Sequence, residues 1–409
     1  GYEIAPDQYV VMTRDELRAT ATRMFDRADR DHDERLDAAE LSAQAPERPE
    51  ARTKGQRQGQ RPGQGQAPGQ RQRPGGSTRN NGRQTDPSQA PPFHTEVPAH
   101  PFDVILGRPT DRAITMSVVS YEDVLGYVAI GTSPNVLTRR STEVALPAGK
   151  PVAITIDSLE PNTAYHYQLH RRKGGVELPP GALARFYTQR APGASFTFTI
   201  QADSHLDLNV TPALYERTLG NARADRPDFH FELGDTFMTD KFARYADAIS
   251  QYRAQRYYFG QLCDSSPLFF VLGNHDGETG SRRNDNAENI TVWSARTRTT
   301  FLPNPYPDGF YSGNTADEPF VGKLGDYYAF EWGNALFVVL DPFWYTTTRH
   351  FAENDFWGRT LGERQYRWLE STLKSSRMAH KFVFIHHLVG GSSRDARGGA
   401  EASAYFEWG

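Results

Sequence analysis

The carboxyl-terminal half of the sequence places acidic, amide and imidazole side chains directly after four short hydrophobic runs. These are side chains that hold metal ions, and each group stands just beyond a run typical of a strand. The positions are Asp203 and His205, then Asp235, then Asn274 with His275 and Asp276, and last His386 with His387. One aspartate or histidine after a strand is usually a turn former or a hydrogen-bonding residue. Four such positions together predict a shared site.

The chemistry of this set points to two metal ions. Imidazole and carboxylate suit borderline cations such as Zn, Fe or Mn. An aspartate can bridge two ions about 3.5–4 Å apart, and a water between them becomes a hydroxide nucleophile near neutral pH. The same ions neutralise charge on a phosphoryl oxygen and hold the ester for in-line attack. The residues therefore predict hydrolysis of a phosphate ester.

Strands that alternate with helices must position these side chains. The pattern predicts strands over 196–200, 229–233, 268–272, 335–340 and 381–385, and helices over 211–224, 245–262 and 361–375. This alternation indicates an α/β domain over 195–409, with ligands beyond the carboxyl ends of the strands.

A long polar insertion over 277–327 follows the third group of predicted ligands. Long loops at the mouth of a site are often lids or binding loops. Its arginines are candidates for gripping a phosphate bidentately, with ordinary surface charges as the alternative. They are Arg282, Arg283, Arg296 and Arg298. Trp344 and Tyr345 are expected either to line the cleft or to pack.

The ordered motifs Asp203-x-His205, Gly234-Asp235, Gly273-Asn274-His275-Asp276 and His386 resemble those of the calcineurin-like metallophosphoesterase superfamily. The resemblance covers about residues 195–409 and implies an α/β sandwich of two mixed sheets flanked by helices. It implies hydrolysis of phosphate mono- or diesters by direct attack of a metal-bridging hydroxide, with two ions of Fe, Zn or Mn as cofactors. The implied ligands are Asp203 and His205 for one metal, Asp235 as the bridge, and Asn274 and His386 for the second.

The resemblance also assigns roles to the neighbours of these ligands. It implies that His275 touches the phosphoryl or leaving-group oxygen as a general acid or charge stabiliser. Asp276 is expected to support His275 in catalysis, and a plain turn or cap role is the alternative. His387 is the alternative to His386 as the metal ligand.

Two departures from the family pattern matter. The family ends its site with a Gly-His-x-His motif, but this sequence has no histidine after His387. We therefore expect either a fragment or a natural chain that continues, with the last strands of the sheet still to come. Relatives place a tyrosine (purple acid phosphatases) or a supporting aspartate three residues after the bridging aspartate, where Met238 stands here. No purple colour is expected, and whether Asp240 substitutes for that aspartate is open.

Residues 98–190 show the pattern of an all-β module. Short alternating runs over 113–119, 126–130 and 152–156 are separated by turn signals, as in a small sandwich. The stretch 159–167 resembles the start of the penultimate strand in fibronectin type III domains, in which a tyrosine closes a turn by bonding back to the backbone. This order of domains resembles purple acid phosphatases and alkaline phosphatase D-type enzymes. The module is expected to pack against or position the catalytic domain.

The amino-terminal residues 12–45 have the pattern of an EF-hand, a helix–loop–helix that binds Ca²⁺. The expected ligands are Asp29, Asp31, Asp33, Arg35 through its carbonyl, Asp37 and Glu40. Glu34 stands where the loop normally has glycine, so calcium binding is expected to be weak, and a vestigial acidic loop is the alternative. Residues 46–95 then form a Gly/Gln/Arg/Pro linker too poor in apolar residues to fold. It is expected to be a tether or, alternatively, a basic arm for an acidic polymer.

Composition excludes several classes of protein. The 409 residues contain no apolar run of about 18 residues, so no membrane-spanning helix is expected. The single cysteine, Cys263, rules out an internal disulfide framework, and a net charge of −4 does not imply nucleic acid as a partner. We favour a periplasmic or secreted location, because low cysteine content, a weak calcium site and a β-sandwich all suit one. A cytoplasmic location is the alternative. The expected partner is a phosphate ester substrate. The alternative function is a calcium-binding surface or adhesion protein with an inert phosphoesterase domain.

Overall fold

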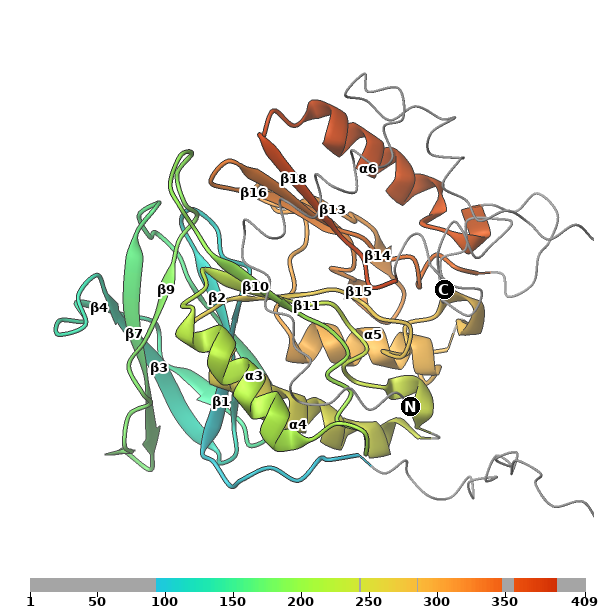
Figure 1. The fold of residues 1–409 in the computed structure, drawn as a ribbon. Coiled ribbons are helices and arrows are strands. Elements are labelled where there is room, and N and C mark those ends of the chain that lie inside the picture. Colours follow the sequence, from blue (N-terminus) through green and yellow to red (C-terminus); the bar gives the residue numbers. More distant parts are fainter. Residues whose placement is uncertain (1–92, 243, 285, 348–356, 388–409) are drawn as a thin grey trace, which may run out of the picture. The chain divides into compact units, whose positions relative to one another are not determined.

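The computed structural model describes residues 93–242, 244–284, 286–347 and 357–387 (Figure 1). The predicted EF-hand over 12–45, with its calcium ligands, lies outside the described residues, as does nearly all of the predicted linker. Among the described residues, no helix combines the length and apolar character needed to cross a membrane.

The described chain begins in contact with the α/β part, at a point where the sequence predicted linker. Phe93 forms an antiparallel bridge with Asp207, and the His94 N–H donates to the Leu206 carbonyl at 2.7 Å. The Phe93 ring stacks on Phe242, with centroids 5.1 Å apart. The predicted linker boundary at residue 95 is therefore too late, because Phe93 already has an apolar surface to bury.

Two antiparallel sheets form the β module. One holds β1 (Phe102–Gly107), β2 (Ile114–Ser120) and β6 (Pro151–Ile156); the other holds β3 (Val124–Gly131), β4 (Arg139–Arg140), β5 (Val144–Leu146), β7 (Ala164–Lys173), β8 (Val176–Glu177) and β9 (Ala184–Tyr187). Side chains from both sheets share one apolar core, among them Val118, Val128 and Leu169. The Glu160 N–H donates to Oη of Tyr165 at 2.9 Å, which is the tyrosine-closed turn that the sequence predicted.

The α/β part contains two further sheets. The first is parallel throughout its described strands, β10 (Phe198–Gln201), β11 (Phe229–Glu232) and β12 (Leu268–Phe270). The second, in the order β13 (Ser312–Gly313), β16 (Tyr328–Trp332), β17 (Ala335–Val339) and β18 (His380–Phe384), is mixed. The strands β14 (Asp317–Glu318) and β15 (Gly322–Lys323) form a separate hairpin. The expectation of two mixed sheets is thus met by the second sheet only.

Aromatic rings fill the space between these two sheets. Phe229, Phe231 and Phe269 from the first sheet meet Phe330, Phe337 and Phe384 from the second. Phe231 stacks on Phe384 with centroids 4.1 Å apart. Because side chains alternate along a strand, Leu268 and Phe270 point to the opposite face of the first sheet, where they pack against helices.

Helices cover both outer faces, so the layers are helix, sheet, sheet and helix (Figure 1). The helices α3 (Pro212–Ala224), α4 (Tyr245–Cys263) and α5 (Ile290–Phe301) lie on the first sheet. The helix α6 (Gly362–Ser375) lies on the second, where Trp368, Leu369 and Leu373 contact Leu336 and Val338. Three short 3-10 turns complete the described part, η1 (Thr239–Lys241), η2 (Gly280–Arg282) and η3 (Trp357–Arg359).

The α4 helix joins the β module to the α/β part. Arg256 of α4 is fully buried, and its guanidinium donates to the Ser117 carbonyl at 2.8 Å and to Ser117 Oγ at 2.9 Å. It also donates to the Phe301 carbonyl at the end of α5. Burial lowers the pKa of Arg256 to about 10. This residue of α4 therefore contacts both a strand of the sandwich and the end of α5 in the α/β part.

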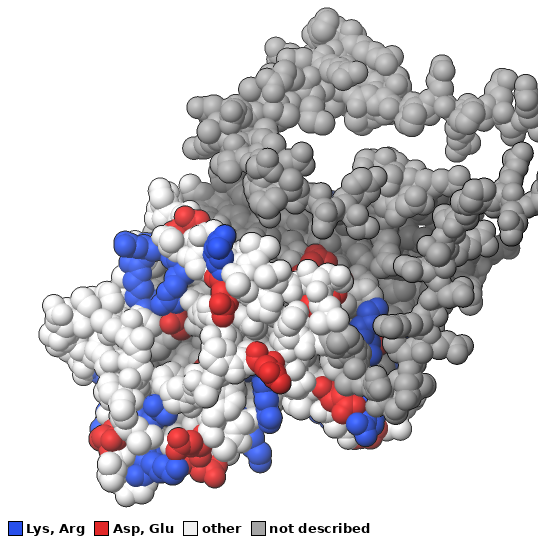
Figure 2. All heavy atoms as spheres, turned by 60° about the horizontal axis from the view of Figure 1, so that its bottom comes forward, with Lys and Arg blue, Asp and Glu red and all other residues white. Residues whose placement is uncertain are grey.

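Figure 2 shows one face of the molecule coloured by charge. On the described part of this face, acidic and basic side chains are interspersed and form no broad region of one sign.

Candidate metal centre

The predicted site residues lie in turns that follow the carboxyl ends of four strands. Because β10, β11 and β12 are parallel, the turns after them meet at one edge of the first sheet. Asp203, His205 and Asp235 have positive backbone φ angles of 59°, 22° and 52°. Residues other than glycine adopt this left-handed region at a cost in conformational energy, and they often do so at functional sites. The surrounding structure must therefore hold these turns in a conformation that a simple reversal of the chain does not require.

Asp203, His205 and Asp235 form a compact group. One candidate ligand atom from each residue lies within 4.8 Å of the others. Nε2 of His205 is 3.3 Å from Asp203 Oδ1 and 3.9 Å from Asp235 Oδ2. Nδ1 of the same ring is 3.5 Å from Asp207 Oδ2, a position from which a carboxylate can orient a ligating imidazole.

The donor set of this group fits a transition-metal ion. Nε2 of His205 is buried and makes no hydrogen bond within the described part of the chain. A buried ring nitrogen without a hydrogen-bond partner, beside two carboxylates, is a free energy cost that a cation in this position removes. The mixed nitrogen and oxygen donors suit Zn, Fe or Mn.

His386 approaches Asp235 from the other sheet. Its Nε2 is 3.4 Å from Asp235 Oδ2, and its Nδ1 lies 2.7 Å from the Leu233 carbonyl. Because Nδ1 donates its proton to that carbonyl, Nε2 is the nitrogen with a lone pair for a metal. Asp235 Oδ2 is therefore close to the Nε2 atoms of both His205 and His386.

Asn274 and His387 contact each other. Nε2 of His387 is 2.9 Å from Asn274 Oδ1. The structure thus places the first histidine of the pair beside Asp235 and the second beside Asn274.

The charges around Asp235 favour a cation. Burial lowers the pKa of His386, but the hydrogen bond and charge of Asp235 outweigh it and raise that pKa to about 9. The nearby Asp203 carboxylate raises the pKa of His205 against the opposing effect of burial. Burial would raise the pKa of Asp235, yet the hydrogen bond and charge of His386 make the net shift downward. Metal binding releases such protons from its ligands.

Asp276 holds the turn that carries Asp235. Its buried carboxylate accepts four backbone N–H groups, those of Asp235 at 3.0 Å, Thr236 at 2.9 Å, Phe237 at 2.9 Å and Gly273 at 2.8 Å. Burial and then the charge of Asp235 raise the pKa of Asp276 to about 7, against these donors. These contacts match the turn or cap role that was the alternative for Asp276. The carboxylate makes none of these four bonds to the His275 ring, which it was expected to support.

The partner of the His275 ring is Asp240. Nδ1 of His275 lies 2.9 Å from Asp240 Oδ2, and the backbone N–H of His275 donates to Asp235 Oδ1 at 2.8 Å. Met238 adopts a left-handed conformation with φ 47° and starts η1, which carries Asp240 to the histidine. The sequence left this residue open, since only the geometry of the turn shows that an aspartate five residues after Asp235 reaches the ring.

The polar insertion is more ordered than the sequence predicted. It contains α5, whose start is capped by the Asn289 side chain accepting the Thr291 N–H. Arg298 of α5 is fully buried and donates to both Glu278 oxygens, at 2.6 and 3.0 Å. The hypothesis that Arg298 is a surface residue or grips substrate is therefore wrong.

Three other residues that the sequence suggested for the cleft, Arg283, Trp344 and Tyr345, have partners within the protein. Arg283 pairs with Glu318 at 3.1 Å and lies over the Trp344 ring, 4.8 Å from its centroid. Trp344 is buried, and the Tyr345 hydroxyl donates to Asp326 Oδ2 at 2.8 Å. Both aromatic residues thus take part in packing.

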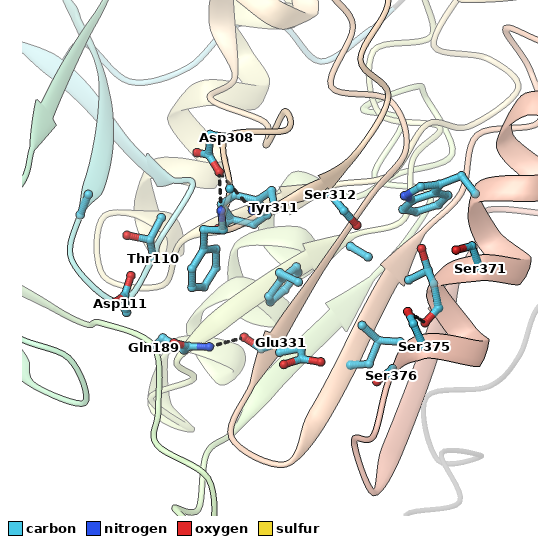
Figure 3. A pocket seen from close by; sticks show the side chains of 18 residues that line it. Thr110, Asp111, Gln189, Asp308, Tyr311, Ser312, Glu331, Ser371, Ser375 and Ser376 are labelled. Carbon is cyan, nitrogen blue, oxygen red and sulfur yellow. Dashed lines mark hydrogen bonds between the residues drawn. The ribbon is translucent and has the colours of Figure 1, made fainter.

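A wide cavity of about 1040 Å³ lies elsewhere, between the β module and the second sheet. Figure 3 shows Thr110 and Asp111 on one side of it, Ser371 and Ser375 of α6 on the other, and a hydrogen bond from Gln189 to the Glu331 carbonyl. None of the predicted transition-metal ligands lines this cavity, so it is distinct from the candidate metal centre.

Comparisons with known proteins give fold-level similarities of limited extent. No family profile and no curated protein matches the sequence. Among solved structures, PhoD shares 17% identity and a TM-score of 0.48 over 72% of this chain and 62% of its own. A purple acid phosphatase from seeds of yellow lupin (Lupinus luteus) shares 17% identity and a TM-score of 0.48 over 74% of this chain and 53% of its own.

A human fibronectin type III domain shares 13% identity and a TM-score of 0.18 over 23% of this chain and 75% of its own. The described chain spans less than two thirds of both phosphatase structures. An assignment of chemistry therefore rests on the geometry of the site itself.

Proposed function

We propose that the protein is a hydrolase of phosphate mono- or diesters with a dinuclear metal site. The observation that supports this most directly is the position of Asp235 Oδ2, 3.9 Å from Nε2 of His205 and 3.4 Å from Nε2 of His386. One carboxylate between two imidazoles is the arrangement expected of a residue that bridges two ions.

The proposal divides the candidate ligands into two sets that share Asp235. Asp203 and His205 would complete one set, and Asn274 and His386 the other, with His387 as the alternative to His386. Fe, Zn and Mn suit these donors. When bound, two such ions lower the pKa of a water held between them and neutralise charge on a phosphoryl oxygen.

The chain itself supplies a proton donor beside this site. Asp240 accepts the Nδ1 proton of His275, so Nε2 is left to face the substrate, and the side chain of His275 is 19% exposed and can be reached. A protonated His275 would donate from Nε2 to the leaving-group oxygen, while the Asp240 carboxylate stabilises the imidazolium. The bond from the His275 N–H to Asp235 ties this donor to the bridging residue.

Asp276 is proposed to position the turns that carry the metal ligands. Its carboxylate binds the backbone on both sides of the site, at Asp235 and at Gly273, and so fixes the two turns relative to each other. Calcium binding by residues 12–45 and an extracytoplasmic location stay predictions.

The test is hydrolysis of p-nitrophenyl phosphate and its bis-ester with added Zn, Mn or Fe. Metal-dependent turnover should fall by at least about 100-fold in Asp235→Asn, since even changes behind the ligands of metal sites cost about 10–100-fold. Asp225→Asn, an exposed carboxylate at the end of α3, is the matched control and should retain activity.

The two esters separate monoesterase from diesterase activity, and metal content per chain is measured on the same samples. Absence of both turnover and bound metal in the wild-type protein would overturn the proposal. Equal activity in Asp235→Asn and the wild type would overturn the bridging role.

A further inference from the structure

A smaller cavity of about 370 Å³ opens where the β module meets the first sheet of the α/β part. Its wall includes Pro227 and Ser266, which precede β11 and β12. The candidate metal ligands follow the carboxyl ends of the same strands. The cavity and the metal centre therefore lie at opposite edges of the sheet.

Basic side chains line this cavity, and none of the described residues in its wall is an aspartate or a glutamate. Arg185 comes from β9, and Arg223 and Arg226 lie at and just beyond the end of α3. Arg223 is paired with Asp264. Within the described part of the chain, the guanidinium groups of Arg185 and Arg226 form no hydrogen bond or ion pair; Arg185 only approaches the Tyr187 ring, at 5.6 Å. The wall thus carries two positive charges without an acidic partner.

A histidine adds a further polar group to the same wall. His166 of β7 is directly opposite Arg185 of β9 in the strand register. Its Nδ1 is buried and forms no hydrogen bond with any described residue. A buried polar atom of this kind is normally satisfied by water or by a ligand.

We propose that this cavity binds a small phosphorylated molecule. Arginine presents planar, bidentate donors that match phosphate oxygens, and two unpaired arginines supply enough charge for a phosphate dianion. The volume of about 370 Å³ is within the range of about 300–1,000 Å³ found for small-molecule sites, which leaves room for an organic group.

The ligand would connect two parts of the protein. Arg185 belongs to the β module, and Arg226 belongs to the α/β part. Binding between them is expected to raise the thermal unfolding temperature, because a ligand that binds only the folded state stabilises it.

The test is calorimetric titration at constant ionic strength with inorganic phosphate, propylphosphonate and malonate. Propylphosphonate carries the same anionic group on an organic tail and has no ester to hydrolyse. It should bind at least as tightly as inorganic phosphate, and malonate should bind more weakly. Arg185→Gln and Arg226→Gln should each weaken binding by about tenfold, the loss expected for a charge-assisted hydrogen bond. Arg217→Gln on α3, exposed and outside the cavity, should leave it unchanged.

A further variant separates this cavity from the metal centre. In Asp235→Asn, propylphosphonate binding to the cavity should persist. Loss of binding in Asp235→Asn, with normal binding in both arginine variants, would assign the anion to the metal centre and overturn the proposal. If malonate bound as tightly as propylphosphonate, the cavity would not select a phosphate group. If inorganic phosphate bound more tightly than propylphosphonate, the cavity would not favour an organic part on the ligand.

Discussion

Asp240 is the residue whose contact with His275 only the turn geometry reveals. Replacing it with asparagine should lower kcat by about 10–100-fold, because the His275 ring loses the carboxylate that orients it and stabilises its charged form. The loss should be greater for esters with poor leaving groups, which need protonation most. Steady-state kinetics on p-nitrophenyl and alkyl phosphates measure this. Asp247→Asn, a carboxylate paired with Arg244 on the surface, is the control.

A double variant tests whether the two residues act as a unit. If Asp240 works through His275, Asp240→Asn should add little to the loss already caused by His275→Ala. Independent, additive losses would contradict this positioning role.

The sequence could place most of the candidate ligands because their signal is local. A hydrophobic strand followed by Asp203 or Asp235 is visible without knowledge of the fold. The partners of Asp276 and His275 could not be predicted in the same way. They depend on left-handed turns at Asp235 and Met238, and the one-letter pattern leaves several backbone paths open.

The elements show the same division between local and distant information. The helices α3, α4 and α6 lie close to their predicted ranges. In contrast, α5 was not predicted, because its sequence is rich in threonine and its polar residues include Arg298. What allows Arg298 to be buried is Glu278, 20 residues away in the sequence. Amphipathic periodicity cannot show such a pair.

Replacing only one partner of the Glu278–Arg298 pair should destabilise the folded protein strongly. Glu278→Gln should lower the free energy of unfolding by about 3–5 kcal/mol, because it leaves a buried guanidinium without its counter-charge. The double variant Glu278→Gln with Arg298→Met should recover part of that loss. Urea unfolding of the four proteins in the cycle measures both effects. A single-variant loss below about 1 kcal/mol would show that the pair is solvated in solution.

At the scale of the whole molecule, the junction between the β module and α4 contains a titratable pair. Nε2 of His100 is 2.9 Å from Asp103 Oδ1, and the His100 ring lies 5.0 Å from that of Tyr257 on α4. The hydrogen bond with Asp103 raises the pKa of His100 against the effect of burial. A raised folded-state pKa means that this stabilisation is present below the ordinary value and is lost as the pH rises through the folded-state value.

The difference in unfolding free energy between the wild type and His100→Gln should therefore depend on pH. It should be larger near about pH 5.5 than near about pH 9, by about 1 kcal/mol or less, since the pair is partly exposed. Urea unfolding at the two pH values gives the difference. A gap that does not change with pH would exclude an ionic contribution from His100. His380→Gln, an exposed histidine of β18, is the control for histidine titration itself.

The ring stack of Phe231 on Phe384 has a consequence for the candidate metal centre. Asp235 follows the strand of one ring and His386 follows the strand of the other, so the two proposed ligands belong to different sheets. The thickness of an aromatic layer therefore acts as the spacer that sets how far apart they stand. Residues deep in the core, which touch neither metal nor substrate, would in this way tune which pair of ions fits.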